Sequence, residues 1–227
     1  MMFPTLRMLG LLLLLAMLGC VHPRQAQQEV PFHVVIGSNS YGYPGSQMQL
    51  VNSIQGDLFQ ARLSRLKFPD CASGSLDVVE FSGTIDSTSL SSLNSLMQSL
   101  QPCLRRDGSR VVSPVYLNSA QGDLLLGIQL GKSFQTQAVE VIVSEGQVCE
   151  SACAVAYLGA VYKRVQATGR VVLHLSGEHG RGFDCARSID MMPLKNYLLS
   201  TNSRQSGQSL YNQALTHCSS GKGWDLS

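Results

Sequence analysis

The chain changes its hydrophobic pattern near residue 75. From there on, short apolar runs predict strands, and apolar residues at helical spacing predict the helices between them. The expected strands cover residues 76–81, 111–117, 138–143 and 171–175. The expected helices lie near residues 90–100, 123–132, 152–158 and 191–199. Because alternating strands and helices form right-handed βαβ units, we expect an α/β fold with a largely parallel sheet.

The pattern before residue 75 is less regular. Residues 32–36 predict a strand, and the Gly- and Pro-containing run at 41–45 predicts a turn. Between residues 47 and 67, apolar side chains recur at roughly helical spacing, which favours a helix. We therefore expect an N-terminal extension at 31–74, followed by the main domain at 75–220.

The first residues are typical of an export signal. Arg7 is followed by an apolar run at 8–18 that is too short to span a bilayer comfortably. Met17-Leu18-Gly19-Cys20 resembles a bacterial lipobox, with Met17 in place of the usual leucine. We expect a signal peptide at 1–19, a lipidated Cys20 and a polar, Gln-rich tether at 20–30, on the periplasmic side of a bacterial cell envelope. An uncleaved anchor or a misassigned start is the alternative.

The charge and the cysteine content limit which ligands and cross-links the chain is expected to have. A formal net charge of +2 without any Lys/Arg block argues against nucleic acid. Besides Cys20 the chain holds an even set of cysteines, which in an oxidising compartment favours disulfides of undetermined pairing. These are Cys71, Cys103, Cys149, Cys153, Cys185 and Cys218. A zinc site from His174, His179 and Cys185 is the weaker alternative, since no CxxC pair accompanies it. We expect no metal and no cofactor.

Three segments carry candidate chemistry. Ser151 stands before a helix of small and apolar residues, close to N–H groups that the helix leaves unpaired. His174 ends an apolar strand, and Gly122 lies in a turn after another strand. Taken singly, these residues are typical of a helix cap, a core histidine and a turn glycine. Together they supply the nucleophile, the base and the oxyanion donors that acyl transfer requires.

At these segments the chain resembles the Clp protease proteolytic subunit and, more broadly, the Clp/crotonase fold, including the exported Clp-like proteins of bacteria. The resemblance covers residues 76–200. It rests on Phe81-Ser82-Gly83-Thr84-Ile85, Leu117-Asn118-Ser119-Ala120-Gln121-Gly122-Asp123, Ser151-Ala152 and Val172-Leu173-His174. The 29 residues from Gly122 to Ser151 and the 23 from Ser151 to His174 are close to the spacings in that family. Repeated βαβ units of the Clp/crotonase type are implied.

The resemblance also implies roles. Ser151 would be the nucleophile, His174 its base, and the N–H groups of Gly122 and Ala152 the oxyanion hole. Ala120-Gln121 replaces the family's Pro-Gly, and a positive φ at Gln121 would be strained. The triad acid has no clear match. We assign it to Asp225, with Asp184 and Asp190 as alternatives.

Two further features bear on the nucleophile. Cys149 and Cys153 bracket Ser151, and a disulfide between them would rigidify its turn, although pairing with more distant cysteines is also open. Lys163 raises a Ser–Lys dyad, but its Tyr-Lys-Arg-Val run is typical of a solvated connection.

The leading hypothesis is an envelope-located serine peptidase or related hydrolase that acts on peptides or proteins and is held at the membrane by its lipid. It leaves assembly into a homo-oligomer open. The alternative is a non-catalytic Clp-like binding or scaffold lipoprotein. Acyl chemistry on coenzyme A is disfavoured because export separates the chain from that cofactor.

Overall fold

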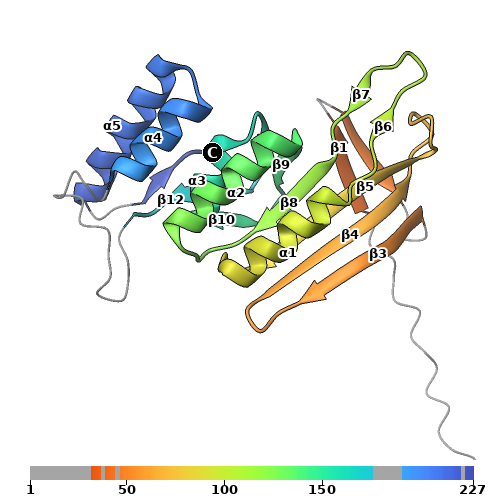
Figure 1. Cartoon of the computed structure of the whole chain (residues 1–227), viewed down its shortest axis with the longest axis horizontal. Coiled ribbons are helices and arrows are strands. Elements are labelled where there is room, and N and C mark those ends of the chain that lie inside the picture. Colours follow the sequence, from red (N-terminus) through yellow and green to blue (C-terminus); the bar gives the residue numbers. More distant parts are fainter. Residues whose placement is uncertain (1–31, 37–38, 44–46, 176–190, 221–222) are drawn as a thin grey trace, which may run out of the picture. The chain divides into compact units, whose positions relative to one another are not determined.

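A six-stranded mixed sheet forms the centre of the fold (Figure 1). The structure is a computed structural model that describes residues 32–36, 39–43, 47–175, 191–220 and 223–227. The strand order is β11-β9-β8-β5-β4-β3. These strands are β11 (Tyr162–Val165), β9 (Glu140–Val143), β8 (Pro114–Asn118), β5 (Ser75–Gly83), β4 (Phe59–Lys67) and β3 (Met48–Gln55). The first four are parallel to one another, whereas β4 and β3 are antiparallel. The prediction of an α/β fold with a largely parallel sheet is confirmed.

A second, smaller sheet has the order β10-β12-β13. β10 (Val148–Glu150) runs parallel to β12 (Arg170–Leu173), and β13 (Trp224–Asp225) is antiparallel to β12. The strand predicted at 171–175 therefore exists, but it does not join the strands at 76–81, 114–117 and 139–143 in one sheet. The sequence did not predict β10, because three residues are too few to form a recognisable apolar run. β12 pairs with this strand and not with the central sheet.

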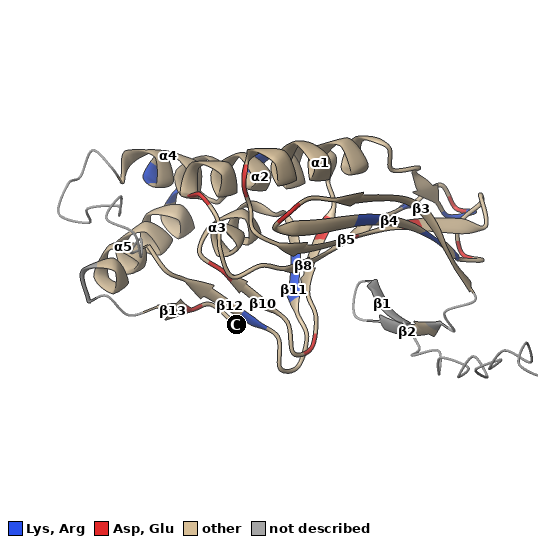
Figure 2. Ribbon diagram, turned by 90° about the horizontal axis from the view of Figure 1, so that it is seen from below, with Lys and Arg blue, Asp and Glu red and all other residues tan. Residues whose placement is uncertain are grey.

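Three helices pack on one face of the central sheet. These are α1 (Ser87–Gln98), α2 (Leu124–Gln137) and α3 (Ala152–Gly159). Figure 2 shows α1 and α2 on the same side of β5 and β8. Asp86 caps α1 by accepting from Ser89 N at 2.7 Å, and Asp123 caps α2 by accepting from Leu125 N at 2.8 Å. The helices expected near 90–100, 123–132 and 152–158 are confirmed.

α4 (Met192–Thr201) joins the same core through one aromatic side chain. Tyr197 is 1% exposed, and its hydroxyl donates to the carbonyl oxygen of Val155 in α3 at 2.9 Å. Gly131 of α2 and Gly159 of α3 leave the room for this hydroxyl, because a Cβ at either position would collide with it. Burial raises the pKa of the Tyr197 phenol. The tyrosine thus joins three helices.

The helix expected at 47–67 is wrong, since these residues form the β3–β4 hairpin. β4 buries Phe59, Ala61 and Leu63 at alternate positions, which is the period of a strand, whereas most of β3 is exposed. The apparent helical spacing came from mixing the two strands. Pairing with β5 over nine residues, from Phe59–Gly83 to Lys67–Ser75, attaches the hairpin to the central sheet.

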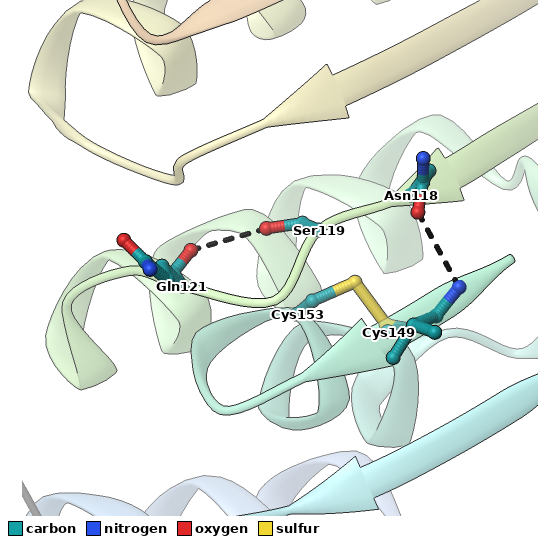
Figure 3. The surroundings of a disulfide bond; sticks show 6 residues. Asn118, Ser119, Gln121, Cys149 and Cys153 are labelled. Carbon is teal, nitrogen blue, oxygen red and sulfur yellow. Dashed lines mark hydrogen bonds between the residues drawn. A yellow bond between two sulfur atoms is a disulfide. The ribbon is translucent and has the colours of Figure 1, made fainter.

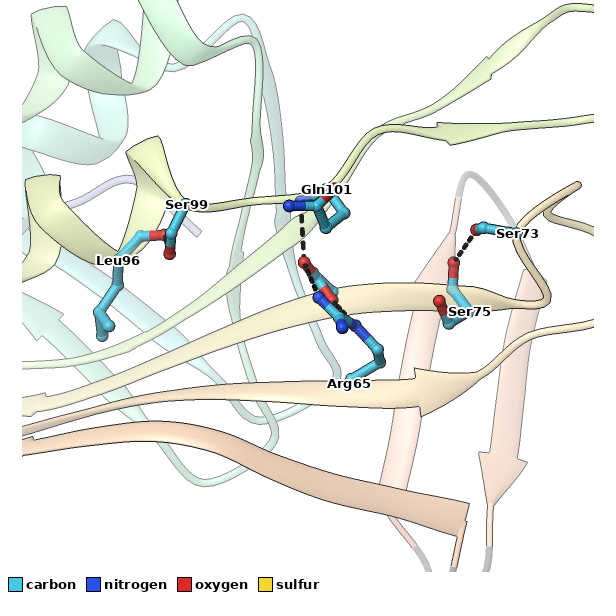
Figure 4. Close-up of polar contacts among 7 residues, drawn as sticks. Arg65, Ser73, Ser75, Leu96, Ser99 and Gln101 are labelled. Carbon is cyan, nitrogen blue, oxygen red and sulfur yellow. Dashed lines mark hydrogen bonds and ion pairs between the residues drawn. The ribbon is translucent and has the colours of Figure 1, made fainter.

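An ion pair with one buried partner joins the start of β5 to the end of β4. Asp77 on β5 is 1% exposed and binds Arg65 on β4 at 2.8 Å (Figure 4). Its second oxygen accepts from the backbone N–H of Gln101, after α1, at 2.8 Å. Nearby, a disulfide joins Cys71 and Cys103, both within a second apolar cluster on the other face of the sheet. The ion pair and the Gln101 hydrogen bond thus join β4, β5 and the segment after α1.

The remaining elements are short hairpins and a C-terminal helix. They are β1 (Phe32–Ile36), β2 (Asn39–Tyr43), β6 (Cys103–Leu104), β7 (Arg110–Val111) and α5 (Arg204–Ser220). No helix within the described residues is long and apolar enough to cross a membrane. The predicted signal peptide, Cys20 and tether lie outside those residues.

Candidate functional site

Ser151 lies in the turn between β10 and α3. Its backbone has φ 54° and ψ −121°, a conformation that L-residues rarely adopt. Ser151 N donates to the carbonyl oxygen of Val172 on β12 at 3.1 Å, and its own carbonyl accepts from Val155 N at 3.1 Å. Although Ser151 occupies the N-cap position of α3, its hydroxyl makes no capping hydrogen bond. The turn thus presents a hydroxyl that the helix does not use.

A disulfide connects the two sides of this turn. Cys149 on β10 and Cys153 in the first turn of α3 are bonded, with their Cα atoms 5.1 Å apart (Figure 3). Both side chains are fully buried. Of the two pairings left open by the sequence, the structure has the local one. A cysteine nucleophile at 149 is thereby excluded in the oxidised protein.

The loop after β8 approaches Ala152. Residue 122 pairs with Ile85, because Ile85 N donates to the carbonyl of Gln121 at 3.0 Å and Asp123 N donates to the carbonyl of Ile85 at 3.2 Å. Peptide groups alternate along an extended segment, so the N–H of Gly122 is directed to the opposite side. A Cβ at Gly122 would lie 2.8 Å from the Ala152 Cβ. No group in the described part of the chain accepts from the N–H of Gly122 or of Ala152.

Gln121 does not carry the strain that a positive φ would impose. Among the described residues, the non-glycine positions with positive φ are Ala138 and Ser151. The loop obtains its unusual backbone from Gly122, with φ +158°. The replacement of Pro-Gly by Ala120-Gln121 is therefore compatible with the loop conformation.

Asn118 and Ser119 hold this loop against β10, which the sequence did not reveal (Figure 3). Ser119 is 2% exposed, and its backbone exchanges hydrogen bonds with Val148 and Glu150 at 2.8 and 2.7 Å. Its hydroxyl donates to the Gln121 carbonyl at 3.1 Å, and Asn118 Oδ1 accepts from Val148 N at 3.3 Å. The loop that contains Gly122 is thus joined directly to the strand that leads into the Ser151 turn.

His174 directly follows the last residue of β12. β10 and β12 are parallel, with Glu150 opposite Val172, so Ser151 and His174 lie at the carboxyl ends of adjacent strands. The imidazole contacts Gly223, where a Cβ would come within 2.6 Å of its Nε2. The two predicted residues therefore lie at the same end of the small sheet, and their roles stay predictions.

Asp225 lies on β13 opposite Val172. Its carboxylate accepts from Arg170 at 3.1 Å and from the backbone N–H and hydroxyl of Ser227. The hydrogen bonds from Ser227 and the neighbouring Arg170 lower the pKa of Asp225. Among the described residues, no hydrogen bond joins His174 to a carboxylate. Asp184 and Asp190 lie outside them, so the identity of a triad acid stays a prediction.

Lys163 lies at the far end of α3 from Ser151. Its ammonium donates to the carbonyl oxygens of Leu158 and Ala160 at 3.0 and 3.1 Å, which are acceptors at the end of the helix. Burial lowers its pKa. This position leaves no Ser–Lys dyad. The expected solvated connection is wrong, however, because Tyr162–Val165 form strand β11 of the central sheet.

The remaining cysteine and metal expectations are only partly within the described residues. Cys218 on α5 is disulfide-bonded, while His179 and Cys185 lie outside. No group of three metal-ligating side chains occurs among the described residues. The pairs Cys71–Cys103 and Cys149–Cys153 confirm the expectation of disulfides at these four positions.

A hollow of about 230 Å³, lined mainly by polar residues, lies on the face of the central sheet away from the helices. It is lined by Gln60 and Arg62 of β4, Glu80 and Ser82 of β5, and Tyr116 and Asn118 of β8, among others. Burial raises the pKa of Glu80, and the positive charge of Arg62 opposes this shift.

No family model matches the sequence, and no curated protein matches it either. Similar solved structures include ClpP1 from Listeria monocytogenes, with a TM-score of 0.46 and 15% identity over 66% of this chain and 82% of that chain. A point mutant of the same protein matches with a TM-score of 0.46 and 17% identity over the same shares. The ClpP protease catalytic domain from Plasmodium falciparum has a TM-score of 0.42 and 12% identity over 66% of this chain and 75% of that chain.

Proposed function

We propose that this protein is a serine hydrolase of the peptidase type, with Ser151 as nucleophile and His174 as general base. The observation that carries the proposal is the turn at Ser151, whose hydroxyl is free of capping and whose neighbour Ala152 contacts Gly122. Buried backbone N–H groups are usually paired, so two unpaired ones at this contact point to a ligand that they bind. Two such donors are the arrangement that stabilises an oxyanion.

The chemistry follows from these positions. As the Ser151 oxygen attacks a carbonyl carbon, its proton passes to the His174 imidazole. The N–H groups of Gly122 and Ala152 stabilise the negative charge that develops on the carbonyl oxygen. His174 then donates the proton to the leaving amine, which departs and leaves an acyl group on Ser151. A water molecule, deprotonated by His174, releases the acyl product and restores the serine.

The substrate and location belong to the same proposal. The resemblance of the sequence motifs to the Clp protease proteolytic subunit supports a peptide or protein substrate. The apolar run at 8–18 and the lipobox-like sequence at Cys20 support export to the bacterial envelope with a lipid anchor. Disulfides at Cys71–Cys103 and Cys149–Cys153 agree with an oxidising compartment.

A non-catalytic binding protein is the second candidate function. It is favoured by the partners of Asp225. The carboxylate of this residue is hydrogen-bonded to Arg170 and Ser227 and not to His174. Without a carboxylate to orient it, the imidazole would be a weaker base. In this case, the protein would hold a peptide without cleaving it.

Labelling of purified protein with a fluorophosphonate probe tests the proposal. The wild type should react at Ser151, and Ser151→Ala should not react. Peptidase activity should fall to the same level in Ser151→Ala, in His174→Ala and in the double variant, because residues that act as a unit are not additive. A wild type that neither labels nor cleaves a broad peptide library would establish the binding protein instead. Asp225→Asn should cost less than Ser151→Ala if Asp225 is the acid, and nothing if it is not.

A further inference from the structure

We propose that the Cys149–Cys153 disulfide positions the Ser151 hydroxyl for reaction. This inference rests on the proposed hydrolase function and adds two positioning residues to it. Neither sulfur is placed to act on a substrate, because both side chains are fully buried beneath the turn. Their effect is exerted through the backbone that they enclose.

The backbone at Ser151 needs such support. Ala138, the other described non-glycine residue with positive φ, lies in the common left-handed region with φ 51° and ψ 47°, where it ends α2. Ser151 has a similar φ but a ψ of −121°, which is outside that region and is normally left to glycine. A serine persists there only if the surrounding structure fixes the residues on both sides.

The disulfide fixes both sides at once. Cys149 belongs to β10, which is paired with β12 and bridged to Ser119. Cys153 belongs to α3, which packs in the main core. The bond between them closes a small ring around residues 150–152, with the strained serine in the middle. Relaxation of Ser151 to a negative φ would have to change the direction of the chain within this closed ring.

The second described disulfide provides the contrast. Cys71 and Cys103 are separated by 32 positions, whereas Cys149 and Cys153 are separated by four. A cross-link restricts the unfolded chain more when it closes a longer loop. The Cys71–Cys103 bond therefore contributes mainly to global stability. The Cys149–Cys153 bond contributes less to it, and its main effect is local, at the turn that carries the nucleophile.

The experiment compares Cys149→Ala/Cys153→Ala with Cys71→Ala/Cys103→Ala in the exported, oxidised protein. The variant at 149 and 153 should label with fluorophosphonate about 100-fold more slowly, since a displacement of about 1 Å at a reacting group costs that much. Its kcat should fall by a similar factor with little change in KM. The pH profile should keep its shape, because the imidazole is not altered. The variant at 71 and 103 should show the larger loss of thermal stability and wild-type labelling.

Crystal structures of the wild type and of both variants give a readout that does not depend on activity. The backbone at residue 151 should have positive φ in the wild type and in the variant at 71 and 103, and negative φ in the variant at 149 and 153. Equal labelling rates in all three proteins, or an unchanged φ in the variant at 149 and 153, would overturn the inference. A wild type that never labels would overturn the proposed hydrolase instead, and the φ of residue 151 alone would then decide whether the disulfide holds this turn.

Discussion

At the scale of single residues, the candidate oxyanion hole depends on the absence of a Cβ at Gly122. Gly122 lies so close to Ala152 and Ile85 that a Cβ would come within 2.8 Å of the Cβ of each and of the Ile85 carbonyl oxygen. Two of these three neighbours belong to structure that cannot move easily: a helix start and a backbone carbonyl. An added methyl group must therefore displace the loop.

Gly122→Ala should slow fluorophosphonate labelling by about 100-fold, the usual cost of losing one oxyanion donor. Gly108→Ala is the matched control, since Gly108 has φ +81° with nothing within 4 Å of its Cβ position. The control should lose about 1 kcal/mol of stability through backbone strain and keep its labelling rate. Similar labelling rates for Gly122→Ala and the control would remove Gly122 from the site.

Glu80 should make the stability of the protein depend on pH. Its pKa is raised from 4.5, first because of burial, while Arg62 opposes the shift. Tyr116 lies opposite Glu80 on the next strand, and Arg62 lies opposite Glu80 on β4. Because the folded protein holds the proton more tightly than the unfolded chain, stability falls as pH rises from the unfolded pKa through the raised folded pKa.

Glu80→Gln should therefore have a higher melting temperature than the wild type at pH 7 and the same one below about pH 4, where both states of the wild type are protonated. Thermal unfolding followed by circular dichroism at several pH values measures this difference. Glu145→Gln removes the same charge from an exposed turn and serves as the control. A variant less stable than the wild type at pH 7 would show that attraction to Arg62 outweighs burial.

At the scale of elements, the sequence predicted what local chemistry determines. α1 and α2 were expected from apolar residues at helical spacing, and the structure adds that Asp86 and Asp123 cap them by accepting from N–H groups of the first turn. Ser151 was expected before α3 because a run of small residues follows it. β3 and β4 were missed because they are held by strand pairing, of β3 with β4 and of β4 with β5, which no local spacing reveals.

The candidate site was predictable in the same uneven way. The Ser151 turn, Gly122 and His174 each carry a local signal, and parallel strand order brings the serine and the histidine to one edge. The roles of Asn118 and Ser119 depend on contacts with β10 across 30 positions of chain, so nothing local indicated them. Likewise, the short β13 placed Gly223 against His174 and Asp225 beside Arg170, and two residues are too few to form a recognisable pattern.

The packing of α4 on α2 and α3 should be sensitive to the Tyr197 hydroxyl. Gly131→Ala would collide with this oxygen and with the adjacent ring carbon, so we expect a loss of about 1–3 kcal/mol from overpacking. Tyr197→Phe should cost about 1 kcal/mol through the lost hydrogen bond to Val155. In the Tyr197→Phe background, Gly131→Ala should cost less, because part of the collision is gone.

Urea unfolding of the wild type, both single variants and the double variant gives the coupling between the two positions. A coupling of at least about 0.5 kcal/mol is expected for residues in direct contact. Strictly additive losses would show that the hydroxyl does not set the distance between α4 and α2.

At the scale of the whole molecule, the cysteines bear on where the protein works. Cys71–Cys103 links the hairpin side of the sheet, Cys149–Cys153 encloses the turn at Ser151, and Cys218 on α5 is bonded as well. Bonds in three separate regions would have to persist for the protein to keep its fold and its proposed site. Disulfides persist in the periplasm and are reduced in the cytosol, so this distribution supports the proposal of export.

Export predicts a defined mature N-terminus. Cleavage before Cys20 should leave this cysteine as the first residue, with its thiol and amino group acylated. Several acyl chains on one residue hold a protein at a membrane stably, whereas a single chain is marginal. Mass spectrometry of the N-terminal peptide from membranes of an expressing bacterium should find the acylated Cys20. Cys20→Ser should be released from the membrane fraction while keeping its fluorophosphonate labelling, because the anchor lies far along the chain from Ser151. An unmodified Cys20, or a mature chain beginning elsewhere, would exclude the lipid anchor and leave the hydrolase proposal unchanged.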